Sequence, residues 1–506
     1  MLSKVHAAAL RGVDALPVEV EVHVGPGEER VVMVGLPDAA VRESIDRVST
    51  ALTSSGYRLP PGKTTVNLAP ADLRKEGPSF DLPIAVGWLI ASEQADKGIS
   101  ADYAMIGELA LTGTVRRVKG VLSVATRTHK EGRRGLLVPA ENAAEAAVVR
   151  GLEVIPVKTV RDAAGFLANT TPITPTHVDT KALFQHHSNG EYDLSEVKGQ
   201  ETVKRALEIA AAGGHNLILI GPPGTGKSML AKRLAGILPP LTLDEALETT
   251  RIHSVSGLLE PNQSLVTQRP FRSPHHTASD AGLLGGNINP SPGEISLAHH
   301  GVLFLDELPE FRRRVLETMR QPLEDGHVTI SRAAGTMTFP AQFMLVAAMN
   351  PTPDGKMPAE SRSSPREIQN YLGRISGPLL DRIDLHVEVP PVKFREMSAQ
   401  AGGETSATIR ERVIASRSIQ SKRFDGKIAC NARMQSRDLQ RHCALDDSTR
   451  DLLKMAMEEL DLSARAYDRI LKVARTIADL TGAESLGVEH VSEAIQYRSL
   501  DRQIWT

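Results

Sequence analysis

Residues 221–228 read Gly-Pro-Pro-Gly-Thr-Gly-Lys-Ser, and this octapeptide constrains the fold more than any other part of the chain. It stands between an apolar run, 216–220, and an amphipathic run, 229–238. Glycines let the backbone turn so that several N–H groups point at phosphate oxygens, and the following helix presents its positive end to the same anion. The pattern predicts a strand, a phosphate-binding loop and a helix. The flanking runs weigh against the alternative, a glycine turn between two core elements.

Each part of the octapeptide has an expected role in binding a nucleotide triphosphate, ATP, together with Mg²⁺. The backbone that cradles the phosphates is expected to comprise Gly221, Pro222, Pro223, Gly224, Thr225 and Gly226. Lys227 is expected to reach the outer phosphates, and the Ser228 hydroxyl to hold Mg²⁺.

Further along, four apolar residues run into two acids, Asp306 and Glu307. This pattern is typical of a buried parallel strand that ends in carboxylates. We expect Asp306 to bind the Mg²⁺ that Ser228 also holds, and Glu307 to polarise a water aimed at the γ-phosphate. A solvated strand end is the alternative for the acid pair taken alone.

Residues 310–324, after the acids, are expected to form one helix. Two further features extend this site. Residues 327–339 alternate in polarity about a central glycine and predict a β-hairpin with Arg332 near its tip. The buried strand expected at 344–349 ends in Asn350, whose amide could hold the attacking water or report the γ-phosphate. The alternative for Asn350 is a turn that begins before Pro351.

Bulk composition bounds the class of protein. A chain of 506 residues should form about three domains. Its net charge of −2 gives no global sign of a nucleic-acid or membrane partner, and no run approaches the roughly twenty apolar residues of a membrane span. The two cysteines, Cys430 and Cys443, cannot build a disulfide framework or a four-thiolate zinc site, so a soluble protein of the reducing cytoplasm is expected.

The pattern along the chain predicts a multidomain α/β protein in four segments. Residues 1–168 alternate short strands, expected at 18–24, 64–68, 135–139 and 154–157, with helices, and should form an α+β domain. Residues 169–190 read as a Thr- and Pro-rich linker. A parallel-sheet nucleotide-binding domain is expected at 191–392, followed by an all-α domain at 393–506.

The order of phosphate loop, acid pair, hairpin and Asn350, followed by 376–385 (Ser-Gly-Pro-Leu-Leu-Asp-Arg-Ile-Asp-Leu), resembles AAA+ ATPases. With the stretches 271–277, 292–300 and 462–467, the chain is most similar to the magnesium-chelatase-like ComM/YifB family over essentially its whole length. In that family the last segment is a helical lid domain.

The resemblance implies roles for two arginines. Arg382 would be an arginine finger inserted into the ATP site of the neighbouring subunit, and Arg465 the lid-domain sensor arginine over the γ-phosphate, with Arg469 a weaker candidate. A homo-oligomeric ring, a hexamer in the family, would follow. The alternative is that both arginines form salt bridges within their own domain.

The chain departs from the family pattern in two places. Relatives usually carry cysteines after the sensor asparagine, which resemble a zinc site, whereas here Thr352, Asp354, Ser361, Ser363 and Ser364 occupy this region. We therefore expect no zinc and a flexible loop at 351–365.

The first domain resembles the Lon-protease-like, ribosomal-S5-like fold, with Ser79 in the loop that carries the nucleophile in Lon. Val124 stands where its lysine would align, so the chain is not expected to be a protease.

Three functions fit the sequence: two in which ATP hydrolysis drives a motor, and one in which the protein binds ATP without hydrolysing it. The resemblance implies a motor that translocates, branch-migrates or unwinds DNA, with Arg332 a nucleic-acid candidate. Residues 410–441 support this with nine basic residues against three acids, although such a stretch is more often a solvated face. The others are a chelatase-type motor acting on a protein partner and a non-enzymatic scaffold that binds ATP.

The pairs His275-His276 and His299-His300 favour hydrogen bonding over metal binding, since neighbours on a strand point to opposite faces.

Overall fold

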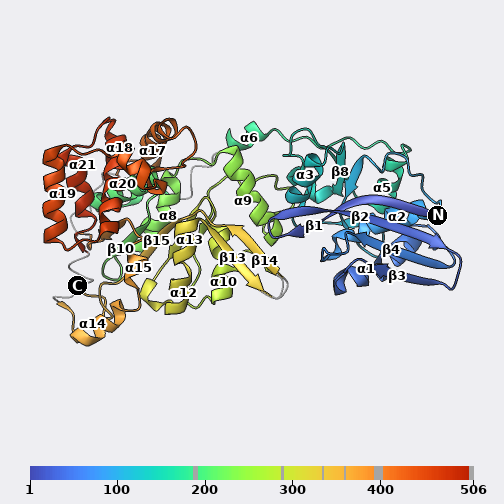
Figure 1. The fold of residues 1–506 in the computed structure, drawn as a ribbon, viewed down its shortest axis with the longest axis horizontal. Helices are drawn as coiled ribbons and strands as arrows, with labels where there is room; N and C mark the ends of the chain where they lie inside the picture. The colour runs from blue at the N-terminus through green and yellow to red at the C-terminus, as the bar shows by residue number, and fades with distance from the viewer. Residues whose placement is uncertain (186–191, 287–289, 333–334, 358–359, 393–402, 501–506) are drawn as a thin grey trace. The chain divides into compact units, whose positions relative to one another are not determined.

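The structure, a computed structural model, describes residues 1–185, 192–286, 290–332, 335–357, 360–392 and 403–500. The chain forms two compact units (Figure 1). The first comprises Met1–His186 and Thr242–Thr267, and the second His187–Leu241 and Gln268–Thr506. None of the helices in the described ranges is long and apolar enough to cross a membrane.

The first unit is built on a mixed seven-stranded sheet in the order β3-β4-β2-β1-β5-β8-β9. Its strands are β1 (Leu2–Arg11), β2 (Asp14–Gly25), β3 (Arg30–Val34), β4 (Lys63–Ala69), β5 (Tyr103–Met105), β8 (Gly135–Pro139) and β9 (Glu153–Val157), and β6 (Glu108–Leu109) pairs with β7 (Val115–Arg116) apart from it. The strands expected at 18–24, 64–68, 135–139 and 154–157 are present. The strand β1 was not predicted, because its buried residues include three consecutive alanines, Ala7, Ala8 and Ala9, and so do not alternate with polar ones.

Helices pack against this sheet in two clusters of buried side chains. They are α1 (Ala39–Ser54), α2 (Asp81–Ala91), α3 (Val121–Lys130), α4 (Ala143–Ala146) and α5 (Val160–Leu167). Helix α6 (Thr180–Gln185) packs instead through Leu183 and Phe184 against a separate small cluster. Helix α2 is buried along its whole length, which explains its uniformly apolar sequence. Helix α6 lies inside the segment that the sequence assigned to a linker.

The segment 242–267 belongs to the first unit, although the sequence placed it within the nucleotide-binding domain. Its helix α9 (Leu243–Ser256) begins at a capping box formed by Thr242 and Glu245. The Ser254 hydroxyl donates a hydrogen bond to the buried carboxylate of Glu145, and Arg251 binds the Val13 carbonyl at 3.0 Å. The residues that make these contacts lie far apart in the sequence, so the local sequence pattern did not predict them.

The second unit contains a parallel five-stranded sheet in the order β11-β12-β15-β10-β16. Its strands are β10 (Leu217–Ile220), β11 (Phe271–Arg272), β12 (Val302–Leu305), β15 (Met344–Met349) and β16 (Leu385–Glu388). Strands β10, β12 and β15 are fully buried, as their uninterrupted apolar runs predict. Their carboxyl ends meet at one edge of the sheet, where the phosphate loop follows β10.

Helices and a hairpin surround this sheet. They are α7 (Glu201–Gly213), α8 (Lys227–Ile237), α10 (Asp280–Leu284), α11 (Glu294–Leu297), α12 (Arg313–Thr318), α13 (Arg320–Asp325), α14 (Pro365–Leu372), α15 (Gly377–Leu380), and the hairpin of β13 (His327–Arg332) and β14 (Gly335–Pro340). The hairpin expected around Arg332 is confirmed. The single helix expected at 310–324 is instead split at Met319, because Pro322 has no N–H to continue the helical hydrogen-bonding pattern.

After residue 402 the described chain is helical. The helices are α17 (Ser406–Arg423), α18 (Ser436–His442), α19 (Asp447–Glu459), α20 (Ala464–Thr481) and α21 (Val488–Gln496) (Figure 1). Residues such as Val413, Ile470 and Ile477 share one buried core with Leu217 and Leu219 of β10. The helical segment and the sheet therefore form one compact unit.

Candidate functional site

The phosphate loop turns from β10 into α8 as the glycines predict. Gly224 and Gly226 have φ of 81° and 87°, a left-handed conformation that other residues rarely adopt. Gly226 is the N-cap of α8, and among the described residues no side chain makes a capping hydrogen bond at this position. The end of α8 therefore offers N–H groups and a positive dipole to an anion.

Lys227 and Ser228 meet the other expected residues at this edge of the sheet. The Lys227 ammonium donates to the carbonyls of Gly221 at 2.7 Å and Pro222 at 2.9 Å, and to the Asn350 side-chain oxygen at 3.1 Å. The Ser228 hydroxyl donates to an Asp306 carboxylate oxygen at 2.6 Å. Burial lowers the pKa of Lys227. An anion that approached this ammonium would favour its charged form.

Gln200 and Gly221 hold the phosphate loop in place through contacts with neighbouring backbone. The Gln200 amide donates to the carbonyls of Thr225 at 2.9 Å and Pro390 at 3.0 Å, which ties the loop to the end of β16. A Cβ on Gly221 would lie 2.3 Å from the Val389 carbonyl oxygen, so only glycine fits there. The Gln200 contact was not predicted, because Gln200 and Pro390 are 190 residues apart in the chain.

Glu307 is placed beside Asp306 in an unusual backbone conformation. Its φ is 52°, in the left-handed region, and its N–H donates to Asp306 at 3.0 Å. Its carboxylate lies 3.3 Å from Nδ1 of His276, in the loop after β11. Sequence reasoning missed His276 as a partner of Glu307. Strands β11 and β12 are adjacent and parallel, so the residues that follow them lie at the same edge of the sheet. A sequence-based pairing of these two strands would have indicated the contact of His276 with Glu307.

The structure does not bring Arg382 and Arg465 to the phosphate loop of their own chain. Arg382 precedes β16 and pairs with Glu324, and its guanidinium donates to the Pro378 carbonyl at 2.6 Å. Arg465, at the start of α20, pairs with Asp381 at 3.2 Å. Strands β16 and β10 run parallel in register, so these arginines lie at the amino edge of the sheet and the loop at the carboxyl edge. A four-residue strand separates the edges by about 13 Å.

The two arginines line a common cavity of about 170 Å³ with Glu324, Asp381, Asp468, Arg469 and Lys472. Within the isolated chain Arg382 pairs inside its own predicted domain, as the alternative had it, whereas Arg465 of the helical domain pairs with Asp381 of the domain that carries the sheet. The side chain of Arg465 is 65% exposed, whereas that of Arg382 is 13% exposed. Arg469 instead pairs with the buried Asp384 at 3.0 Å.

A buried polar network anchors the segment that carries Arg382. The Asn216 amide donates to the Arg382 carbonyl at 2.9 Å, and its oxygen accepts from the Leu345 N–H. Asp384 accepts from the Asn216 N–H at 3.1 Å and lies 3.2 Å from His215. Burial alone would raise the pKa of Asp384, but Arg469 and His215 outweigh it and hold this pKa below its usual range. Burial lowers the pKa of His215.

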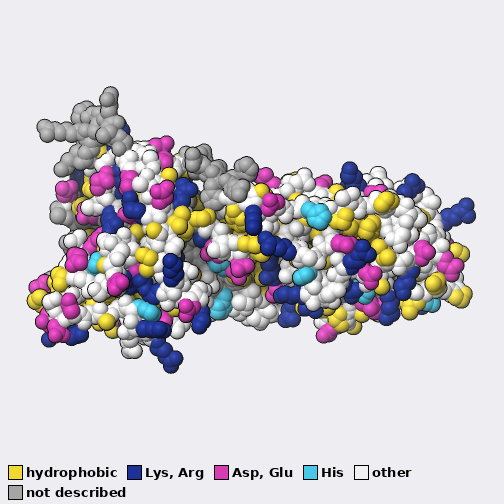
Figure 2. All heavy atoms as spheres, turned by 90° about the horizontal axis from the view of Figure 1, so that it is seen from above, with side chains coloured by type: hydrophobic (Ala, Val, Ile, Leu, Met, Phe, Trp, Pro, Cys, Tyr) yellow, Lys and Arg dark blue, Asp and Glu magenta, His cyan; other side chains and the backbone are white. Residues whose placement is uncertain are grey.

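The basic stretch 410–441 is largely used inside the protein. Its internally bonded arginines are Arg410 with the Gly236 carbonyl, Arg412 with Glu208 and Glu404, Arg417 with the Ala211 carbonyl, Arg423 with Asp479, and Arg433 with the Phe343 carbonyl. On the face drawn in Figure 2, Lys and Arg side chains are interspersed with Asp and Glu. This stretch therefore gives less support to a nucleic-acid surface than its composition suggested.

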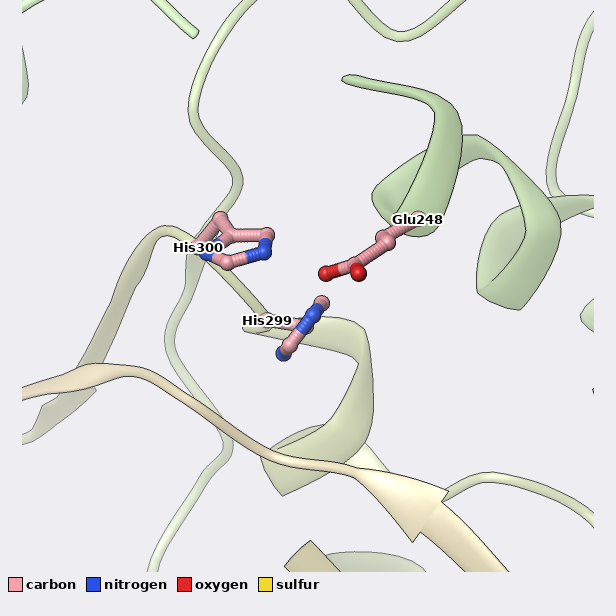
Figure 3. A group of neighbouring side chains, drawn as sticks. All are labelled: Glu248, His299 and His300. Carbon is pink, nitrogen blue, oxygen red and sulfur yellow. The ribbon is translucent and has the colours of Figure 1, made fainter. Parts of the chain in front are cut away.

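The histidine pairs do not lie on strands, so the geometric reason given for doubting a metal site was wrong. His299 and His300 occupy a turn before β12 with their rings 3.9 Å apart (Figure 3). His299 accepts a hydrogen bond from the Gln342 N–H at 3.0 Å, which ties this turn to the start of β15. Glu248 in the same picture belongs to the first unit.

The described residues of the loop 351–365 differ from the flexible segment expected. Thr352 and Ser361 donate hydrogen bonds to the Asp354 carboxylate, and α14 begins at Pro365 behind a capping box of Ser364 and Glu367. In the first unit, Ser79 lies in a 3-10 turn, Pro78–Phe80, and Val124 is buried on α3.

Known proteins resemble the chain in all these regions. It matches the family described as magnesium chelatase, subunit ChlI, over residues 193–397, a second described as subunit ChlI of Mg-chelatase over 20–142, and a third described as the ChlI C-terminal part over 403–498.

Individual relatives align over nearly the full length. The YifB protein of Salmonella typhimurium is 46% identical over 505 residues, which cover 99% of this chain and 98% of the relative. Competence protein ComM of Haemophilus influenzae is 46% identical over 506 residues, with the same coverage. The magnesium-chelatase 38 kDa subunit of Cereibacter sphaeroides is 24% identical over 214 residues, 39% of this chain and 58% of that subunit. The chain therefore belongs to the ComM/YifB family of magnesium-chelatase-like AAA+ proteins.

Proposed function

We propose that this chain is a ring-forming ATPase that hydrolyses Mg-ATP at sites shared between neighbouring subunits. The observation that carries the proposal is the 2.6 Å contact of Ser228 with Asp306, beside the 3.1 Å contact of Lys227 with Asn350. A hydroxyl and a carboxylate are oxygen donors of the kind that Mg²⁺ prefers. The amides at the start of α8 and the Lys227 ammonium suit the phosphates, so the residues fit both groups.

The chain's own residues supply the rest of the chemistry. Mg²⁺, when bound, would neutralise phosphate charge, with Ser228 and Asp306 as its protein ligands. Lys227 would exchange the carbonyls of Gly221 and Pro222 for phosphate oxygens. Glu307 would turn from His276 to orient the attacking water, and Asn350 would report the γ-phosphate.

The positions of Arg382 and Arg465 support a shared site. Both lie at the sheet edge opposite to their own phosphate loop, so we propose that both act on the ATP of the neighbouring subunit. Arg382 would then stabilise charge on the transferring phosphoryl group, as an arginine finger does. Arg465 would be a sensor for the neighbour's nucleotide rather than for its own. A heterologous contact of this kind closes into a ring, a hexamer by family resemblance.

Two variants test the ATPase. Lys227→Ala should abolish ATP binding, measured by equilibrium titration with a fluorescent ATP analogue. Glu307→Gln should bind ATP and assemble but lose turnover by about a hundredfold or more, because it removes the general base. Glu310→Gln, an exposed acid three residues on, is the matched control and should keep wild-type turnover. Normal turnover in Glu307→Gln would remove Glu307 from the catalytic role.

We further propose that ATP hydrolysis moves the chain along DNA, in translocation, branch migration or unwinding. One full-length relative is named a competence protein, and Arg332 is exposed at the end of β13. Residues 333–334, at the tip itself, lie outside the described residues. Single-stranded or forked DNA should raise ATP turnover at low salt, and the effect should fall as salt rises. Arg332→Ala should weaken this stimulation, whereas Lys356→Ala, an exposed cation outside the hairpin, should not.

The second candidate is a motor that remodels a protein partner. It is favoured by the internal use of Arg410, Arg412, Arg417, Arg423 and Arg433, and by the hydroxyls that line one face of the hairpin. Some relatives are named magnesium-chelatase subunits. If DNA neither binds at low salt nor raises turnover, the DNA function fails and a protein partner becomes the better explanation.

A further inference from the structure

The carboxylate of Asp354 lies at the centre of a loop that sequence reasoning expected to be flexible. One of its oxygens accepts hydrogen bonds from the Thr352 hydroxyl at 2.7 Å and the Ser361 hydroxyl at 2.8 Å. The other accepts from the Arg362 N–H at 2.8 Å. These hydrogen bonds, those from Thr352 first, hold the pKa of Asp354 well below its usual range. The carboxylate therefore joins two stretches of the loop while it is charged.

The residue after Asp354 touches the phosphate loop. Gly355 is buried, although Pro353, Asp354 and Lys356 around it are exposed. Its φ is 80°, and a Cβ there would lie 2.7 Å from Cδ and 2.8 Å from Cγ of Pro223. The backbone of Gly355 thus packs directly on a proline of the phosphate loop, in a space that admits glycine alone.

The same loop is also attached to the lysine of the site. It begins at Asn350, whose side chain binds Lys227 at 3.1 Å. The Asn350 carbonyl accepts a hydrogen bond from the Tyr371 hydroxyl at 3.3 Å, which links it to α14. Displacing the loop would therefore disturb the phosphate loop at Pro223 and the lysine contact at Asn350.

We propose that Asp354 is a positioning residue for ATP hydrolysis, which holds residues 350–357 so that Gly355 supports Pro223 and Asn350 meets Lys227. The inference rests on the ATPase function proposed above and adds a residue to it. Asp354 itself does not contact the site. Its carboxylate acts through the backbone that it organises, and small displacements of catalytic groups slow a reaction more than they weaken binding.

The first test is Asp354→Asn, which keeps the side-chain size but places an NH₂ group where N–H or O–H donors now point. We expect kcat to fall about tenfold while KM and the Kd for ATP stay within about threefold of wild type. The control is Glu360→Gln, which neutralises an exposed acid of the same loop and should change neither constant. Asp354→Glu, which keeps the charge, should recover part of the lost kcat.

The second variant reaches the same contact from the other side. Gly355→Ala keeps the side chains that bind Asp354 but puts a methyl group against the Pro223 ring, at a backbone φ of 80° that alanine rarely adopts. It should lower kcat in the same way. Thermal unfolding of both variants, compared with wild type, separates a local effect from a loss of fold, since an exposed loop should leave the Tm nearly unchanged.

Amide hydrogen exchange of Gly221, Gly224, Thr225 and Gly226 decides the outcome independently of turnover. Faster exchange there in Asp354→Asn, with wild-type exchange in Glu360→Gln, would support the proposal. Wild-type exchange and wild-type kcat in Asp354→Asn would overturn it. A wild-type protein that binds Mg-ATP without hydrolysing it would refute the proposed ATPase instead, and exchange would still show whether Asp354 orders the phosphate loop.

Discussion

The two edges of the five-stranded sheet use charge in different ways. At the carboxyl edge, Lys227, Ser228, Asp306 and Asn350 contact one another within a single chain. At the amino edge, Arg382 and Arg465 are paired with acids of the same unit, and Arg465 is 65% exposed. The carboxyl edge has what a nucleotide's phosphates require. The amino edge carries two arginines that lie on the opposite side of the sheet from the phosphate loop of the same chain.

The edges also differ in what supports them. The phosphate loop is held by the Gln200 side chain, which donates to the Thr225 carbonyl, and by the backbone of Gly355, which packs on the Pro223 ring. The segment that carries Arg382 rests on buried side chains, with Asn216, His215 and Asp384 each at most partly exposed. In both segments a side-chain amide, Gln200 or Asn216, donates to a backbone carbonyl of the segment that carries the charged residues.

The largest effect should come from Arg382→Ala. If this arginine completes the neighbour's site, ATP turnover should fall about a thousandfold while ATP binding is retained. Arg382→Lys should not restore turnover, because an ammonium cannot replace the planar guanidinium. Turnover and Kd measured on the same preparations check this, and an Arg382→Ala protein with wild-type turnover would leave the arginine with a structural role only.

A smaller effect is expected for Arg465→Ala. Removing one donor that faces developing charge costs about a hundredfold in turnover. Arg450→Ala, an exposed arginine of α19, is the control and should be without effect. Equal turnover in the two variants would restrict the shared site to Arg382 and would contradict the pairing of both arginines at the amino edge.

The smallest effect is a difference in pH dependence. Burial lowers the pKa of His215, so below about 6.5 the unfolded chain binds a proton that the folded chain does not, and stability should fall as the pH drops. The lowered pKa of Asp384 adds to this loss at still lower pH. Burial also lowers the pKa of Lys227, so stability at the carboxyl edge should rise with pH in the alkaline range, toward about 10.5.

Urea unfolding at pH 5.5 and 7.5 checks the acidic window. Stability should be lower at pH 5.5 than at pH 7.5, because the buried His215 takes up a proton less readily than a histidine of the unfolded chain. His215→Gln should remove much of the difference between the two pH values, whereas His177→Gln, outside the network, should not. A wild-type protein equally stable at both pH values would show that His215 takes up a proton as readily in the folded chain as in the unfolded one.

Local features of this fold were predictable from the sequence. The octapeptide, the acid pair and the position of Asn350 after β15 follow from short apolar runs and the residues that end them. The hairpin followed from alternation around one glycine. In each case the structure depends on neighbouring residues, and sequence patterns report on these directly.

Features that depend on distant contacts were not predictable. The pairing of α9 with the first unit rests on Glu145 and Val13, more than a hundred residues away. His276 contacts Glu307 because the strands that precede these two residues are adjacent in the sheet. The hydroxyls of Thr352 and Ser361 bind the Asp354 carboxylate, whereas the sequence indicated these residues only as replacements for zinc ligands. The position of Arg465 at the amino edge of the sheet was not predicted, because it depends on the contact of Arg465 with Asp381, 84 residues earlier in the chain.

The most direct test of a site shared between subunits is a mixing experiment. Lys227→Ala lacks the loop lysine and Arg382→Ala lacks the finger, so each ring should be inactive alone. In a mixed ring, about one interface in four should join an intact Lys227 to an intact Arg382. The account predicts that mixing the two inactive proteins restores ATP turnover, to about a quarter of wild type if the interfaces act independently. A mixture as inactive as its components, in rings shown to exchange subunits, would contradict it.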